Sequence, residues 1–392
     1  MAATDLEFGE APFEIIDGDR GKNYPKQGDF LDSGHCLFLS ATNVTRTGFD
    51  FSNCQFINEK KDAALNKGKL QREDIVLTTR GTIGNAAYFK HTVPFENLRL
   101  NSGMVILRCD KAKMLPAYLY HFLRSPSFYG QVNSLRSGVA QPQLPIRDMR
   151  RIKLPLPSLP VQRRIAGILS AYDELLENSQ QRIRLLEAMA RSLYREWFVH
   201  FRFPGHEKLP RVASPLGDIP QGWKVRKLGE ILELKYGKAL KMEDRSGGVV
   251  PVFGSSGIVG QHDTALVNGP GIIVGRKGNV GSVFWCVDDF FVIDTAYYVT
   301  SSLPLRFLFY LLPTLNFLNS DAAVPGLSRN QAYTLETLVP PAEVLKKFCA
   351  LADAFERPAY TLQRQIQNLR RTRDLLLPRL LSGQVELKTE AT

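Results

Sequence analysis

The feature that most constrains this chain is an internal repeat with a period of about half its length. A proline-led stretch that runs from Pro157 to Trp197 agrees with a second one that begins at Pro340 when the first is shifted by 183 positions. The shift places Pro157 on Pro340 and Ile165 on Phe348. A repeat of this period indicates a duplicated module and excludes a solenoid of short units.

Both stretches are predicted to form long helices. In the first stretch, apolar or small residues recur at alternating steps of four and three, which is the period of a helix seam that buries against another helix, and the second stretch matches the first at the shift. About 40 helical residues would span about 60 Å, longer than a small domain is wide, so each helix needs a partner. Pro358 lies inside the second stretch, and we expect a kink or break there. The predicted seam consists of Ile165, Leu169, Tyr172, Leu176, Ile183, Leu186, Leu193, Phe348, Phe355, Ile366, Leu369 and Leu376.

Short apolar runs alternate with turn signals in the remainder of each half, and this pattern is typical of strands. We therefore expect a mixed α/β fold with two similar domains. The expected division is a first domain over 1–155, a long helix over 156–203, a second domain over 204–338, a second long helix over 339–382 and a tail over 383–392.

Charge and cysteine content narrow the class of partner and the compartment. The formal net charge is +11 and the pI is about 9.4, which favours a polyanionic partner, although a merely basic surface is the alternative. The five cysteines are scattered, so the sequence predicts no metal site and no redox pair. Their odd number fits a reducing cytoplasm, and neither a secretory start nor an apolar run of about 20 residues is present.

Polar loops at matching places in the two halves are candidates for contact with a polyanion. Gly81 and Gly84 flank one loop, and Gly278 and Gly281 flank another 197 positions later. Arginine and lysine bind phosphates or guanine, whereas asparagine and glutamine pair with adenine. A solvated surface or a structural turn is the alternative reading of each position. The candidates are Arg20, Lys22, Asn23, Tyr24, Arg80, Thr82, Arg136, Gln141, Gln143, Arg147, Arg276, Lys277, Asn279, Arg329 and Asn330.

Catalytic motifs are missing from the sequence. The glycine-rich run over 254–261 lacks the Lys–Ser/Thr of a phosphate-binding loop, and there is no GxSxG elbow and no HExxH pair. No glycine-rich dinucleotide fingerprint opens a βαβ unit. The chain is therefore expected to be non-catalytic and to bind no cofactor itself.

Several segments together form a specific pattern. These are the helix starts IKLPLPSLPVQRRIAGILSAYDELLE and LETLVPPAEVLKKFCALADAFE, the IPQGW entry to the second half, and the loops QPQLPIRDM and VPGLSRNQA. The assembly resembles the specificity subunit of type I restriction–modification systems over nearly the whole chain, and IIDGDRGKNYP is similar to the start of one class of first recognition domain. The first half lacks a Gln–Gly–Trp entry, so we expect its N-terminal strand arrangement to differ.

The resemblance implies a fold and a function. Each half would hold a target recognition domain, and the long helices would pack as an antiparallel coiled coil that spaces the two domains along DNA. The double-stranded target would be bipartite with an unspecified gap. Modification subunits, two in number, would methylate adenine with S-adenosylmethionine, and two restriction subunits would use ATP and Mg to translocate and cut DNA.

Two other functions stay open at this stage: a coiled-coil assembly adaptor that does not touch DNA, and a self-contained DNA-modifying enzyme. The sequence does not predict the target bases, because base preference depends on how loops sit in the grooves and on DNA deformability.

Overall fold

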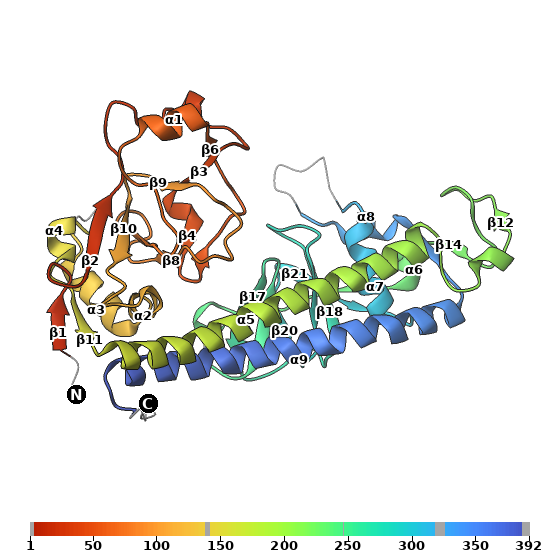
Figure 1. Cartoon of the computed structure of the whole chain (residues 1–392). Helices are drawn as coiled ribbons and strands as arrows, with labels where there is room; N and C mark the ends of the chain where they lie inside the picture. Colours follow the sequence, from red (N-terminus) through yellow and green to blue (C-terminus); the bar gives the residue numbers. More distant parts are fainter. Residues whose placement is uncertain (1–3, 138–141, 246, 318–325, 386–392) are drawn as a thin grey trace. The chain divides into compact units, whose positions relative to one another are not determined.

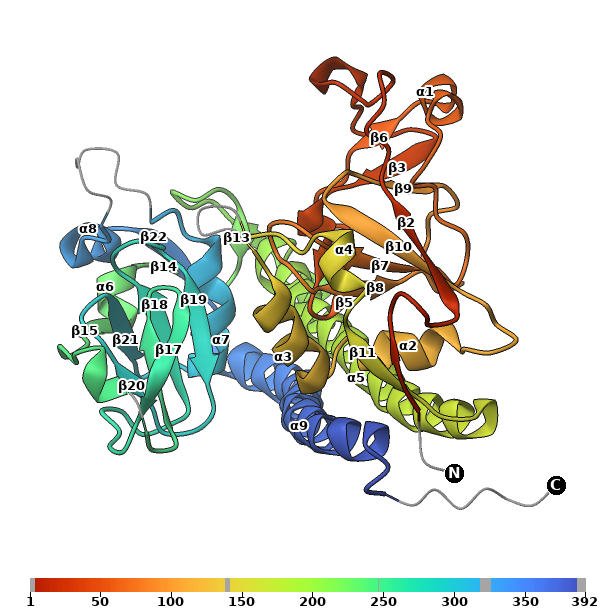
Figure 2. The same cartoon turned by 90° about the vertical axis from the view of Figure 1, so that its left-hand side faces the viewer.

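The computed structural model describes residues 4–137, 142–245, 247–317 and 326–385. The chain divides into two units, one made of residues 1–178 and 365–392 and the other of residues 179–364. We call them unit 1 and unit 2. Each unit combines a mixed α/β portion with one stretch from each of the two long helices, as Figures 1 and 2 show.

Unit 1 is built on a four-stranded antiparallel sheet in the order β2-β10-β7-β8 and a three-stranded sheet in the order β6-β3-β9. The first sheet comprises β2 (Phe13–Asp17), β10 (Met104–Cys109), β7 (Ile75–Thr78) and β8 (Ala86–Tyr88). The second comprises β6 (Phe56–Ile57), β3 (Cys36–Leu39) and β9 (Leu98–Leu100). Two further pairs are β1 (Thr4–Glu7) with β11 (Lys153–Leu156) and β4 (Val44–Thr45) with β5 (Gly48–Phe49). The short helices are α1 (Glu59–Ala64), α2 (Pro116–Phe122), α3 (Pro126–Leu135) and α4 (Ile146–Met149).

Unit 2 repeats this topology. Its four-stranded sheet has the order β15-β21-β18-β19, with β15 (Glu233–Tyr236), β21 (Ala296–Thr300), β18 (Gly271–Gly275) and β19 (Val283–Cys286). Its three-stranded sheet has the order β17-β16-β20, with β17 (Gly257–His262), β16 (Val250–Gly254) and β20 (Phe291–Val292). The remaining strands pair as β14 (Lys224–Lys227) with β22 (Glu336–Val339) and β12 (Arg211–Val212) with β13 (Ile219–Pro220). Its short helices are α6 (Leu228–Ile231), α7 (Leu305–Leu311) and α8 (Arg329–Tyr333).

The entry strands of the two units are arranged alike. In unit 1, β1 pairs antiparallel with β11, and in unit 2, β14 pairs antiparallel with β22. The expectation that the N-terminal strand arrangement differs is therefore wrong. Backbone hydrogen bonds to the strand before the long helix specify this pairing, whereas the Gln–Gly–Trp segment supplies a turn and the buried Trp223 of unit 2.

The two long helices are α5 (Leu159–Tyr194), with 36 residues, and α9 (Ala342–Leu381), with 40 residues. In unit 1, Ile165 and Leu169 from the start of α5 share a core with Leu377 and Leu380 from the end of α9. In unit 2, Tyr194 from the end of α5 shares a core with Leu345 and Phe348 from the start of α9. The helices therefore run antiparallel within each unit.

Pro358 does not break α9, which is continuous from Ala342 to Leu381. The expectation of a break at this proline is wrong. Proline removes the hydrogen bond to the carbonyl four residues earlier, here that of Ala354, and the cost is lower where water can reach that carbonyl. Pro358 lies on the exposed side of the helix, while Ala359 beside it is buried.

Each four-stranded sheet is buried on both faces, and alternate side chains of its strands pack into two different cores. In unit 1, Leu77 and Leu107 face the core with α2, α3 and the long helices, whereas Val76 and Ile106 face the core with β3 and β9. Unit 2 divides in the same way, with Val274 in the helix-side core and Ile273 in the other. Strands buried on both faces hold the loops at their ends on a rigid support.

The short helices are fixed to α5 and α9 by polar contacts at equivalent positions. In unit 1, His121 of α2 lies 3.1 Å from the hydroxyl of Ser170, and Asp173 forms ion pairs with Arg124 and Arg373. In unit 2, Tyr310 of α7 donates to Glu356, which lies 183 positions after Asp173. The repeat thus includes the buried polar contacts between helices as well as their apolar seam.

Candidate nucleic-acid interface

Two loops with the same hydrogen bonds carry the central candidate residues. The β7–β8 loop follows Thr78, whose N–H donates to the carbonyl of Asn85. The β18–β19 loop follows Gly275, whose N–H donates to the carbonyl of Ser282, again 197 positions later. All four loop glycines have positive φ, between 70° and 86°, so a side chain at these positions would be strained. This register makes Lys277 the equivalent of Arg80, and Arg276 the equivalent of Thr79.

A second loop joins the first in both units. The N–H of Leu144 donates to the carbonyl of Thr79 at 2.9 Å, and that of Leu327 donates to the carbonyl of Arg276 at 2.8 Å. Bridges pair Arg80 with Gln143 in unit 1 and Lys277 with Gly326 in unit 2. The structure therefore brings together Arg80 and Gln143, two candidates that are 63 positions apart in the sequence.

Two further loops complete the cluster. The N–H groups of Thr79 and Arg80 both donate to the carbonyl of Gly103, and those of Arg276 and Lys277 both donate to the carbonyl of Thr295. The hydroxyl of Thr82 lies 3.4 Å from the carbonyl of Ala41. In unit 2 the hydroxyl of Ser282, which is equivalent to Asn85, donates to the carbonyl of Ser255 at 2.6 Å. We call these converging segments the loop cluster of each unit.

In unit 1 a buried carboxylate holds the loop after β2 in place. Asp19 is buried, and its carboxylate accepts hydrogen bonds from the N–H groups of Gly21, Asn66 and Lys67 at 2.7, 2.7 and 3.3 Å. The bond from Gly21 contributes most to a pKa of Asp19 below its ordinary value. The loop that carries Arg20 and Lys22 is therefore held by a carboxylate that faces inwards.

The four candidates of this loop play different parts. The amide of Asn23 donates to the carbonyl of Ala64 at 3.0 Å, and the hydroxyl of Tyr24 lies 3.5 Å from the N–H of Ser102, so both side chains hold the loop in place. Lys22 is exposed. Arg20 is exposed too, but it forms an ion pair with Asp17 at 3.1 Å.

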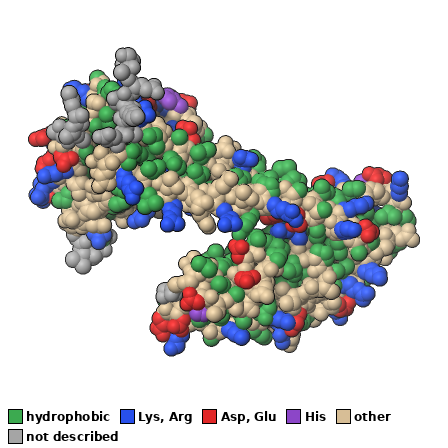
Figure 3. Space-filling model, turned by 90° about the horizontal axis from the view of Figure 1, so that it is seen from below, with side chains coloured by type: hydrophobic (Ala, Val, Ile, Leu, Met, Phe, Trp, Pro, Cys, Tyr) green, Lys and Arg blue, Asp and Glu red, His purple; other side chains and the backbone are tan. Residues whose placement is uncertain are grey.

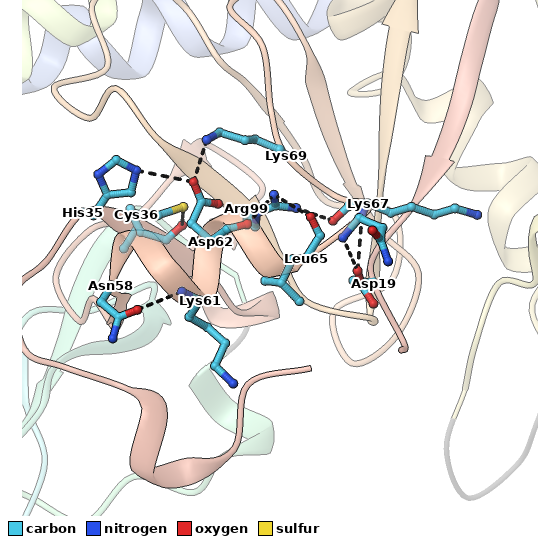
Figure 4. A network of polar contacts seen from close by, with 12 residues as sticks. Asp19, His35, Cys36, Asn58, Lys61, Asp62, Leu65, Lys67, Lys69 and Arg99 are labelled. Atoms are coloured by element: carbon cyan, nitrogen blue, oxygen red, sulfur yellow. Dashed lines mark hydrogen bonds and ion pairs between the residues drawn. The ribbon is translucent and has the colours of Figure 1, made fainter. Parts of the chain in front are cut away.

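A buried ion pair supports the segment on which this loop rests (Figure 4). Asp62 and Arg99 pair with each other, and Arg99 also donates to the carbonyls of Leu65 and Lys67. Lys69 donates to the second oxygen of Asp62 at 2.6 Å. Burial raises the pKa of Asp62, but the hydrogen bonds from Lys69 and Arg99 outweigh it and hold the pKa below its ordinary value. Removing either partner would strongly destabilise the fold, because the other partner would then be a buried unpaired charge.

Four further candidates are exposed at the edges of the loop clusters. Arg136 caps the end of α3, and Arg147 lies on α4 beside Asp148. Asn279 and Asn330 are exposed in unit 2. Gln141 lies outside the described residues.

Unit 2 contains a residue that the sequence did not suggest. The guanidinium carbons of Arg276 and Arg329 lie over the ring of Tyr236, at 4.9 and 5.1 Å from its centroid. Tyr236 is the last residue of β15, and the residue is 46% exposed. The only signal available was its place in the repeat, because β15 corresponds to β2, the strand that leads into the candidate loop of unit 1.

All twelve predicted seam residues are at least partly buried. Six are buried, namely Ile165, Leu169, Leu176, Ile183, Phe348 and Ile366. The other six are half-buried, namely Tyr172, Leu186, Leu193, Phe355, Leu369 and Leu376.

The chemistry of the loop clusters is that of binding. They present guanidinium, ammonium, amide and hydroxyl groups, which are the groups that contact phosphates and base edges. Within the described ranges, no group of three His, Cys, Asp or Glu side chains could hold a metal ion, and all five cysteines are free. Lys and Arg side chains are spread over the face seen in Figure 3, among acidic and hydrophobic ones. No helix in the described part of the chain is long and apolar enough to cross a bilayer.

Comparisons with known proteins agree with this organisation. The family model described as "Type I restriction modification DNA specificity domain" matches residues 13–188 and 220–368. The chain is 26% identical over 346 residues to the type I restriction enzyme MjaIX specificity subunit of Methanocaldococcus jannaschii, covering 80% of this chain and 78% of that one. It is 24% identical over 318 residues to the EcoprrI specificity subunit of Escherichia coli, covering 75% and 74%.

The fold has a match among solved structures. A crystal structure of a type I restriction–modification S subunit from M. genitalium superposes with a TM-score of 0.64 at 17% identity, covering 98% of this chain and 96% of that one. At this identity the match concerns the fold alone.

Proposed function

Since the chain belongs to the family of type I restriction–modification DNA specificity subunits, we propose that its two units read the two halves of one bipartite DNA target. The family is the DNA-recognition component of such systems and is not catalytic. In this proposal, residues 1–155 recognise one half-site and residues 204–338 recognise the other, with an unspecified gap between the half-sites.

The observation that carries the proposal is the loop cluster that is built twice. The backbone hydrogen bonds of the β7–β8 and β18–β19 loops coincide, while the side chains differ, with Arg80 and Gln143 in unit 1 against Lys277 and Gly326 in unit 2. Two related domains that recognise different base sequences would have this combination. The shared backbone geometry would position each loop against DNA, and the different side chains would contact different base edges.

We propose contact roles for the candidates by their chemistry. Cationic side chains would contact phosphates or guanine, and amides would pair with adenine edges. The cationic set is Arg20, Lys22, Arg80, Arg136, Arg147, Arg276, Lys277 and Arg329. The amide set is Gln141, Gln143, Asn279 and Asn330. Asn23, Tyr24 and Thr82 would act mainly by holding their loops, through the hydrogen bonds described above.

The long helices would set the gap between half-sites. Helices of 36 and 40 residues are about 54 and 60 Å long at 1.5 Å per residue. Successive turns of B-DNA are about 34 Å apart, so helices of this length suffice to span one turn. The seam between α5 and α9 would act as the spacer that holds this length.

The chemistry would come from partner subunits in the cytoplasm. We propose that two modification subunits, which use S-adenosylmethionine, bind this chain and methylate one adenine in each half-site. Two restriction subunits, which use ATP and Mg, would add translocation and cleavage. Because a methylated base must leave the helical stack, the loop clusters must bind a distorted duplex.

The test is to express the chain with the modification subunit of its own system in an unmethylated host and to map adenine methylation across the genome. The expected result is a split motif with one methylated adenine on each strand. A stable complex that leaves the genome unmethylated would contradict the proposal and favour an adaptor that does not contact DNA. The variants Arg80→Glu and Arg276→Glu distinguish DNA recognition from an adaptor role. We expect both variants to lose methylation if these loops contact DNA, whereas an adaptor that does not contact DNA would leave methylation unchanged.

A further inference from the structure

The loop clusters of the two units hold a guanidinium at equivalent places. Met104 pairs with Thr78, and Ala296 pairs with Gly275, so Ser102 and Asp294 are equivalent positions. In unit 1, Arg20 donates to the carbonyl of Ser102 at 3.4 Å. In unit 2, Arg276 donates to the carbonyl of Asp294 at 3.1 Å.

The two arginines reach this place from different segments. Arg20 comes from the loop after β2, whereas Arg276 comes from the loop after β18, at the position that Thr79 occupies in unit 1. The two units therefore place a guanidinium at the same carbonyl, although the repeat does not align the two arginines that supply it.

The residue that faces the guanidinium differs between the units. Asp17 and Tyr236 end the equivalent strands β2 and β15, where they pair with Val105 and Tyr297 respectively. Asp17 forms an ion pair with Arg20, which offsets part of its charge. Tyr236 instead presents its ring to Arg276 and brings no opposite charge to it.

Tyr236 also contacts a second cation. Arg329 lies over the same ring, and the loop that carries it is fixed by the hydroxyl of Tyr297, which donates to the carbonyl of Leu327 at 3.0 Å. Among the described residues, neither Arg276 nor Arg329 forms an ion pair with a carboxylate. The face of an aromatic ring attracts a cation, which offsets part of the repulsion between the two guanidiniums that share this ring.

We propose that Tyr236 is a positioning residue of unit 2, whose ring holds the guanidiniums of Arg276 and Arg329 together to bind one backbone phosphate of DNA. The inference rests on the proposed function, since it places this phosphate at the half-site that unit 2 reads. Bidentate geometry and permanent charge make guanidinium well suited to phosphate, and paired guanidiniums on a rigid ring lose little side-chain entropy on binding.

The experiment measures DNA binding by the complex of this chain with its modification subunit, over a range of salt concentrations. The probes are a duplex that carries the split motif from the methylation map and a duplex of random sequence. Tyr236→Leu removes the ring and keeps an apolar side chain, whereas Tyr236→Phe keeps the ring and is the matched control.

We expect Tyr236→Leu to weaken binding of the motif duplex about 5- to 30-fold and to make the slope of log K against log salt shallower by about 1, the change for one lost phosphate contact. Tyr236→Phe should bind within about twofold of the unaltered chain, as cation–π contact requires only the ring. Thermal unfolding of each complex shows whether the variant is folded.

Two results would overturn the inference. A folded Tyr236→Leu complex with unchanged affinity and slope would show that the ring positions nothing for DNA. Relaxed preference at one base pair with an unchanged slope would show that the two arginines read a base edge. Failure of the proposed function is a separate result, in which the complex with the unaltered chain does not distinguish the motif duplex from the random one.

Discussion

At the scale of single residues, the charge of the proposed DNA-contacting loops depends on the partner that each arginine has inside the protein. The ion pair with Asp17 offsets part of the charge of Arg20, whereas the ring of Tyr236 brings no negative charge to Arg276. Two units with the same topology therefore differ in local charge at these loops. Electrostatic contacts of this kind supply much of the affinity of proteins for DNA and depend on salt.

Asp17→Asn should free the guanidinium of Arg20 for DNA. The amide oxygen of asparagine can still accept the bond that the N–H of Gly18 donates to Asp17 at 2.9 Å, so the strand end should keep its conformation. We expect DNA binding by the complex with the modification subunit to become about 3- to 10-fold tighter at low salt, with a steeper salt dependence. The matched control is Glu14→Gln, which changes charge on the same strand away from Arg20. An equal gain in the control would assign the effect to net charge.

His121 should make unit 1 sensitive to mild acid. Burial lowers its pKa from 6.5 to about 3, against the opposing attraction of Asp173, while Arg124 and Arg373 also lie near. The folded chain thus keeps this imidazole neutral, while the unfolded chain protonates it below pH 6.5. The unfolded state therefore binds more protons between pH 6.5 and 3, and stability falls as the pH falls through this window. At pH 5 the cost is about 2 kcal/mol relative to pH 8.

The measurement is denaturant unfolding of the chain at pH 8, 6.5 and 5, with His121→Gln as the comparison. Glutamine can hydrogen-bond to the hydroxyl of Ser170 and does not titrate. The variant should lose most of the difference in stability between pH 6.5 and 5. If both proteins lose the same stability over this interval, carboxylates and not His121 dominate the response.

At the scale of elements, the sequence predicted both long helices because apolar periodicity is a direct consequence of packing against one partner. The outcome at Pro358 was not predictable in this way. Whether a proline interrupts a helix depends on the exposure of the freed carbonyl, and exposure depends on which face the tertiary structure covers. The sequence suggested Arg80 and Gln143 as separate candidates but not their pairing, which depends on the tertiary fold. Tyr236 gave no local signal, because its partners come from two distant loops.

The spacer function belongs to this scale. Deleting seven residues from α5 and the seven that face them from α9 removes about 10.5 Å of helix and turns the helix by only about 20° from register. The seam would thus keep its apolar face. We expect the gap in the methylated motif to shorten by about three base pairs, at 3.4 Å per base pair. A methylation map gives the gap directly, and an unchanged gap in an active complex would refute the spacer function.

At the scale of the whole molecule, recognition and support are joined within each unit. The core of unit 1 includes Tyr118 of α2 together with Leu169 of α5 and Leu380 of α9. A recognition domain is therefore not an independent attachment, since its stability depends on the ends of both long helices. This coupling limits which domains can replace one another, and it predicts that a successful replacement must preserve the surface that faces α5 and α9.

Replacing residues 1–155 with the corresponding domain of another specificity subunit should change one half of the target only. The junction falls within β11, before α5 begins at Leu159, so unit 2 keeps all its residues. The donor domain should offer a cation or hydrogen-bond donor to Asp173, because this carboxylate would otherwise lose Arg124 and lie partly buried with Arg373 alone. A donor without such a partner is the matched control and should yield a complex with a lower unfolding temperature.

Methylation mapping measures the outcome. The half-site that belongs to unit 2 and the gap should be preserved, while the other half-site takes the sequence of the donor. A change in both half-sites would show that neither unit reads its bases alone, and would replace the modular proposal with joint recognition.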